Sequence, residues 1–139
     1  MSQRESIMAA VVKKLSGTSG VGANIFRSRT DPITAAETPA LVLLPESETI
    51  SENTNGAVDA RLLFVVDVHA RAEASADKTA DATCASVHSK LMADPTLGGL
   101  AVDLSELETE WDHEQSDQSL VVVRMRFAAW YRHPRNSLT

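Results

Sequence analysis

The chain has 139 residues, of which 43% are hydrophobic and 23% are charged. This length and composition are typical of a soluble globular protein with one hydrophobic core, so we expect a single domain over residues 1–139 and exclude a chain disordered throughout. Thirteen Lys and Arg against nineteen Asp and Glu give a formal net charge of -6 without a basic block, which argues against tight nucleic-acid binding.

The first elements predicted along the chain are a helix over Gln3–Leu15 and two strands. Ser2 and Glu5 have the spacing of a capping box, and apolar residues follow at helical intervals. Strands are expected at Ile25–Arg29 and at Ala40–Leu44, the second closed by Pro45. The polar segment Glu46–Val58 lacks periodicity, which favours a long loop.

The second half of the chain predicts a long strand, a helix and a final pair of strands. Residues 60–73 alternate cleanly between apolar and polar positions. Ser75 is expected to cap a helix that buries Ala76, Ala80, Cys84, Val87 and Leu91 and ends at Asp94-Pro95. Strands over about 101–114 and 118–133 follow. The order α-β-β-β-α-β-β predicts an α+β two-layer sandwich, a mostly antiparallel sheet of about five strands with two helices on one face.

Parity fixes the expected register of the last two strands. Acidic residues occupy every even position from Glu106 to Glu114, so a regular strand would place five acids on one face. The core positions of the final strand are odd, Val121 to Tyr131. Directly opposed residues of an antiparallel pair point to the same face, so core positions must lie opposite core positions. This requires a loop of odd length near residues 115–118, which places Glu108 and Glu110 beside Arg124 and Arg126. We predict a Glu/Arg ladder on a solvated face; the alternative is a negative surface or a cation site.

The face that carries this ladder is also expected to hold Leu63, Val65, Leu120, Val122 and Trp130. That is more apolar surface than a monomer of this size normally exposes. A contact between subunits would cover it. The alternative is that a loop or a terminal segment of the same chain lies across it.

The sequence contains only weak candidates for a metal-binding or catalytic site. Cys84 and His88 lie one helical turn apart, but a metal site needs further ligands, and a buried Cys is usually a small hydrophobe. Asp67 and His69 share one strand face and would more often form a surface ion pair than a metal or catalytic site. We therefore expect no enzyme, no cofactor and no metal.

Several segments together resemble one protein family. They are the leading helix from Arg4 to Leu15, the strand entry Thr38–Val42, the strand Arg61–Val68, the helix end Val87–Met92, the run Asp94-Pro95-Thr96-Leu97-Gly98-Gly99-Leu100 and the strand Phe127–Tyr131. This pattern, which covers nearly the whole chain, resembles the tail-terminator proteins of long-tailed bacteriophages and prophages, the minor tail protein U family. The run from Asp94 is its most specific part.

The resemblance implies a structural protein that forms a ring, typically of six copies, at the head-proximal end of the tail tube. The ring stops tube growth and offers a surface to head-completion proteins. Expected partners are further copies, the tube protein and a head-completion protein, with DNA passing through without specific binding and no membrane. Expected locations are the host cytoplasm during assembly and then the virion tail.

The family's contacts lie in loops and sheet edges, which singles out residues 27–31, residues 46–58 and the outer sheet face. The residues we expect at these interfaces are Arg27, Arg29, Asp31, Glu46, Glu48, Glu52, Asn55, Leu63, Val65, Val122, Arg124, Arg126 and Trp130. The alternatives are a neck or head-tail completion protein and, from another class, a small cytosolic ligand-binding module on a ferredoxin-like scaffold. A binding module requires a concave apolar pocket with converging polar groups.

Overall fold

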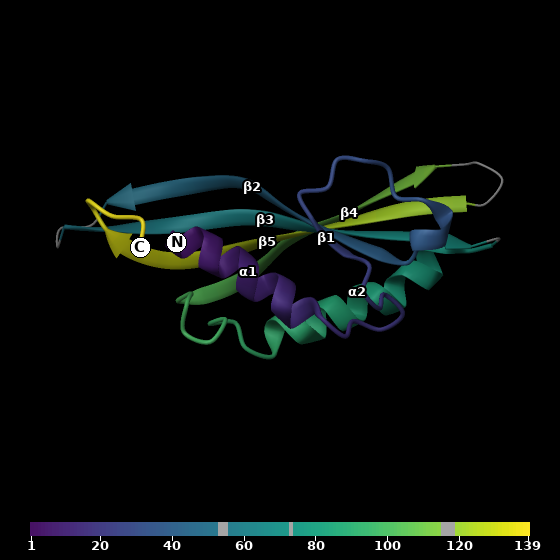
Figure 1. Cartoon of the computed structure of the whole chain (residues 1–139), viewed down its shortest axis with the longest axis horizontal. Helices are drawn as coiled ribbons and strands as arrows, with labels where there is room; N and C mark the ends of the chain where they lie inside the picture. The colour runs from purple at the N-terminus through teal and green to yellow at the C-terminus, as the bar shows by residue number, and fades with distance from the viewer. Residues whose placement is uncertain (53–55, 73, 115–118) are drawn as a thin grey trace.

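Two helices cover one face of a five-stranded sheet in the computed structural model, which describes residues 1–52, 56–72, 74–114 and 119–139 (Figure 1). The elements are α1 (Gln3–Leu15), β1 (Ile25–Arg27), the 3-10 helix η1 (Ala35–Glu37), β2 (Ala40–Glu52), β3 (Ala57–Ala72), α2 (Ala76–Met92), β4 (Asp103–Glu114) and β5 (Ser119–Pro134). The strand order is β1-β2-β3-β5-β4, and only the short β1–β2 pair is parallel. The predicted α+β class, with a mostly antiparallel sheet, is confirmed.

The core lies between the helices and the face of the sheet that they cover, called here the inner face. Alternate residues of β3 and β5 point into it, and Phe64 and Phe127 stack at its centre with ring centroids 5.6 Å apart. Ile7 and Leu15 of α1 and Val87 and Leu91 of α2 close the core from the other side. None of the helices in the described part of the chain is long and apolar enough to cross a membrane.

The caps of the two helices differ from the sequence predictions. The Ser2 hydroxyl accepts a hydrogen bond from the Glu5 amide at 3.2 Å, so the first half of the capping box forms. The Glu5 carboxylate does not complete the box, because it binds Arg27 on β1. Ser75 has a left-handed backbone, with φ of 55°, and no side-chain hydrogen bond to α2. Ser75 thus occupies the predicted N-cap position directly before α2, but its side chain does not cap the helix.

Strand β2 corrects the prediction of a loop over residues 46–58. The strand continues through Pro45 to Glu52 and pairs with β3, which begins at Ala57. Pro45 is tolerated because β1 ends opposite Leu43, so the missing amide of Pro45 lies at an open sheet edge. The polar composition that suggested a loop belongs to an exposed edge strand. Asn55 lies outside the described residues.

Each of the two strands that flank the β3–β5 pair contains one extra residue. The register slips between Pro45 and Ser47 in β2 and between Glu106 and Glu108 in β4. Pro45 and Glu106 lie in the same row across the sheet, because Pro45 pairs with Phe64, Phe64 with Phe127 and Phe127 with Glu106. The bulges therefore flank the stacked phenylalanines, and bulges increase the local twist of a strand.

The bulge in β4 also corrects the prediction that five acids share one face. Glu106 pairs with Phe127 and points to the inner side, where its carboxylate lies 2.7 Å from His88 Nε2 of α2. Beyond the bulge, Glu108 pairs with Arg126 and Glu110 pairs with Arg124 on the opposite, outer face. The predicted register is thus confirmed for this part of the hairpin. The predicted odd-length loop falls on residues 115–118, outside the described part.

Candidate interaction surfaces

The outer face is covered by its own chain at the β1–β2 end. The segment 28–39 crosses it there, over a small apolar cluster of Phe26, Ile33, Ala40, Val42 and Leu44. Arg29 holds the segment: its guanidinium makes two hydrogen bonds to the Glu37 carboxylate, at 2.5 and 2.9 Å, and lies over the Phe26 ring. These bonds, with further ones from Thr34, hold the pKa of Glu37 at about 2.

Ion pairs occupy the middle of the outer face. Asp67 is buried in β3, and Arg124 of β5 donates two hydrogen bonds of 2.8 Å to its carboxylate. Arg126 donates to Glu108 and Glu110 of β4 and to Glu46 of β2. The predicted Glu/Arg ladder therefore forms at Arg126, whereas Arg124 binds Asp67. These hydrogen bonds raise the pKa values of both arginines, which keeps them charged.

The apolar residues predicted on this face are covered to different degrees. Val65 is only 2% exposed, and Leu63, Leu120 and Val122 are half-buried. Arginine side chains cover apolar surface with their methylene stems while their charged ends stay in solvent. Trp130 remains exposed, with the Arg61 guanidinium 5.1 Å from its ring centroid. The alternative of cover from the same chain thus holds for part of the face.

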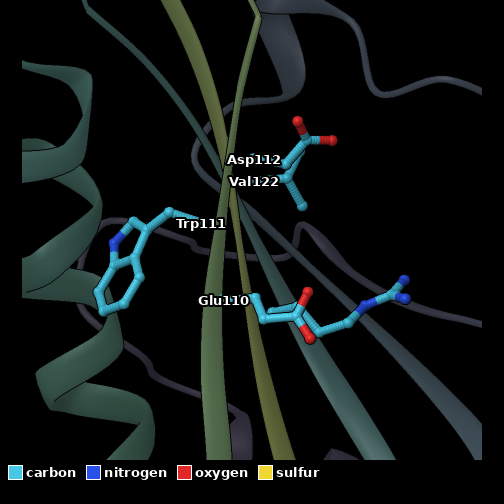
Figure 2. A pocket seen from close by; sticks show the side chains of 5 residues that line it. Glu110, Trp111, Asp112 and Val122 are labelled. Atoms are coloured by element: carbon cyan, nitrogen blue, oxygen red, sulfur yellow. The ribbon is translucent and has the colours of Figure 1, made fainter.

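A different apolar surface lies along β4, at the edge of the sheet. Trp111 is 54% exposed and Leu107, the extra residue of the bulge, is 38% exposed. Figure 2 shows Trp111 on the side of β4 that faces a helix, with Glu110, Asp112 and Val122 on the other side. These four residues and Arg124 line a shallow surface hollow. β4 thus presents Trp111 on one side of the strand and the acidic side chains of Glu110 and Asp112 on the other.

The predicted interface residues fall into three groups. Arg27 and Arg29 are bound to Glu5 and Glu37, and Asp31 is exposed in the segment that Arg29 holds. Glu46, Glu48 and Glu52 lie on β2, where the bulge turns Glu48 to the inner side, within 3.3 Å of Arg4 and in contact with the Tyr131 hydroxyl. The outer-face group is Leu63, Val65, Val122, Arg124, Arg126 and Trp130. Of these, Val65 offers no surface to a partner in this conformation.

Sequence reasoning missed the exposure of Leu107 and Trp111. Parity placed Trp111 on the core side, and the structure does place it on the inner side, opposite the buried Val123. It stays exposed because β4 is the edge strand and α2 packs on β3 and β5. An isolated tryptophan in a strongly acidic strand was the available signal. The bulge at Leu107 left no signal in the alternating pattern.

The residues considered for a metal or catalytic site are held in structural contacts or are buried. Burial raises the pKa of the Cys84 thiol to about 11, so it is protonated and unreactive at neutral pH. His88 contacts Glu106, and Asp67 binds Arg124. Burial lowers the pKa of His69. Within residues 1–52, 56–72, 74–114 and 119–139, no group of three or more His, Cys, Asp or Glu is placed to hold a metal ion.

Comparison with solved structures identifies a similar fold in a phage-like particle. A chain of the structure described as "Virion of native gene transfer agent (GTA) particle" matches with a TM-score of 0.64 and 18% sequence identity. The match covers 91% of this chain and 95% of that chain. No family model and no curated protein matches the sequence. At this identity the likeness establishes a shared fold over nearly the full length of both chains.

Proposed function

We propose that this chain is a structural component of a phage-like virion that caps the head-proximal end of a tail tube as a ring. The observation that carries the proposal is the match to the gene transfer agent virion chain, because it covers nearly all of both chains. The tail-terminator pattern in the sequence, especially residues 94–100, supports the more specific role.

The proposed mechanism is geometric. A head-to-tail contact between identical subunits closes into a ring when its rotation divides the circle, and a closed ring has no free end on which a filament can continue. A ring on the tube therefore stops addition of tube subunits and leaves its other side for a head-completion protein. The net charge of -6 suits a ring through which DNA slides, since phosphates are repelled by an acidic surface.

The test is an assay of tube length. The purified protein is added to polymerising tail-tube protein encoded next to it in the same genome, and tube lengths are measured by electron microscopy. We expect shorter tubes with a ring at one end, and a dose-dependent stop in growth. Tubes that grow as long as in a control with bovine serum albumin would contradict the terminator role. Binding to DNA-filled heads with no effect on tubes would favour a neck or head-tail completion protein instead.

A further inference from the structure

Charge is distributed unevenly across the sheet. Strand β4, called here the acidic flank, carries six Asp and Glu and no Lys or Arg. Residues 3–29, which form α1, the glycine turn and β1 and are called here the basic flank, contain five Lys and Arg against one Glu. The strand order places β1 and β4 at opposite edges. We propose that copies of this chain associate head to tail, with the acidic flank of one copy against the basic flank of the next.

The acidic flank has the features of a contact surface. Trp111 and Leu107 provide apolar area, and tryptophan is the residue type most often found at the energetic centre of protein interfaces. Asp112, exposed on the opposite side of β4 from Trp111, has no ion-pair partner among the described side chains. Residues 103–114 pair with β5 along one side, and no described strand pairs with the other side. Charged edge residues and a bulge keep such an edge from pairing indiscriminately.

The basic flank provides the matching charge. Arg27 is exposed on β1, and its guanidinium is bound to Glu5 of α1 at 2.5 Å. An exposed pair of this kind is weak, because solvent screens both charges, so a carboxylate of a neighbouring copy can compete for the arginine. Lys13 is exposed on α1 and belongs to no ion pair among the described residues. β1 also leaves one side open to a neighbour, because it pairs with β2 alone.

The other contacts that β4 could make with a sheet edge bring like charges together. A two-fold contact of β4 with β4 would oppose two acidic flanks. The outer half of β2 is an open edge as well, but its charged residues are Glu46, Glu48 and Glu52, so it would also repel β4. Repulsion of this kind suppresses wrong partners. Of the contacts that β4 can make with a sheet edge, the one with the basic flank joins opposite charges, and because it joins two different surfaces it can close into a ring. This inference rests on the proposed ring.

The test uses two variants, each with one altered flank. Trp111→Ala with Asp112→Lys alters the acidic flank, and Arg27→Glu alters the basic flank. Sedimentation velocity at rising concentration and low salt should show that the wild type associates and that each variant associates at least about tenfold more weakly. Mixing the two variants should yield a 1:1 dimer that grows no further, because one intact acidic flank meets one intact basic flank.

Two control variants remove similar groups elsewhere. Leu138→Ala removes an exposed apolar side chain near the C-terminus, and Arg135→Glu reverses an arginine that is ion-paired to Glu52. Both should associate like the wild type, and circular dichroism should show all variants folded. A wild type that stays monomeric would overturn the contact, as would an Arg27→Glu variant that associates normally. The tube-length assay is scored separately, so a wild type that shortens tubes without associating by itself would reject this contact and keep the proposed function.

Discussion

The two faces of the sheet are covered by different means. On the inner face, α1 and α2 bury a continuous apolar core around Phe64 and Phe127. On the outer face, the segment 28–39 covers one end and arginine ion pairs cover the middle, where the buried carboxylate of Asp67 lies. The cover of the inner face is stabilised by close packing, so a lost side-chain volume leaves a cavity. The cover of the outer face is stabilised by ion pairs, whose partners water can replace. Stability should therefore be concentrated on the inner side.

The largest effect should come from truncating the core. Phe64→Ala leaves a cavity beside Phe127, and such substitutions cost about 3–5 kcal/mol. Trp130→Ala on the outer face is the comparison, and we expect it to cost about 1 kcal/mol or less, since it removes a half-solvated ring and a cation–π contact. Urea unfolding measures both free energies. Equal losses for the two substitutions would show that the faces do not differ as described.

An intermediate effect should follow from removing the buried carboxylate on the outer face. Asp67→Ala deletes two charge-assisted hydrogen bonds from Arg124, and we expect a loss of about 1–3 kcal/mol in the free energy of unfolding. The loss is limited because Arg124 is 39% exposed and can be hydrated. Asp112→Ala is the matched control on the same face and should change stability by less than about 0.5 kcal/mol. An Asp67 variant as stable as the control would mean that this pair adds nothing.

The smallest effect concerns pH and the segment 28–39. The pKa of Glu37 is about 2 in the folded protein against an ordinary value of 4.5, so the unfolded chain takes up this proton first. The contribution of Glu37 to stability is therefore complete above pH 4.5 and is lost as the pH falls towards 2. Glu37→Gln should be less stable than the wild type at neutral pH. The difference in their free energies of unfolding should shrink as the pH falls from 4.5 towards 2. Urea midpoints measured against pH check this, with Asp31→Asn as the control. A gap that stays constant down to pH 2 would contradict it.

Sequence patterns predicted the elements that face the core. The alternation in β3 and β5 fixed both strands and their facing sides, because a residue turned to the wrong side would expose apolar surface. Helix α1 was predicted with its observed bounds for the same reason. Parity also predicts Glu108 and Glu110 beside Arg124 and Arg126, and these four residues do lie opposite one another. Burial of one side of a helix or strand imposes a regular spacing of apolar residues, and this spacing can be recognised in the sequence alone.

The candidate site was less predictable because it lies in segments where apolar residues are not regularly spaced. Most residues in the outer half of β2 are exposed, so it has the composition of a loop although it pairs with β3. The bulge at Leu107 is invisible because acidic residues continue on both sides of it. Consequently Glu106 was assigned to the wrong face, and Trp111 was assigned to the core side without its exposure being recognised. Edge strands lack a neighbour that would impose a regular pattern on their side chains.

The extra residues Glu46 and Leu107 have a geometric consequence for the whole sheet. Each places two residues of its strand opposite one of the neighbour, whereas β3 and β5 pair with one another without interruption. A strand with such an insertion bends at that point, so the sheet is curved on both sides of its regular central pair. Removing both residues would restore an even register across the four long strands and relax that curvature.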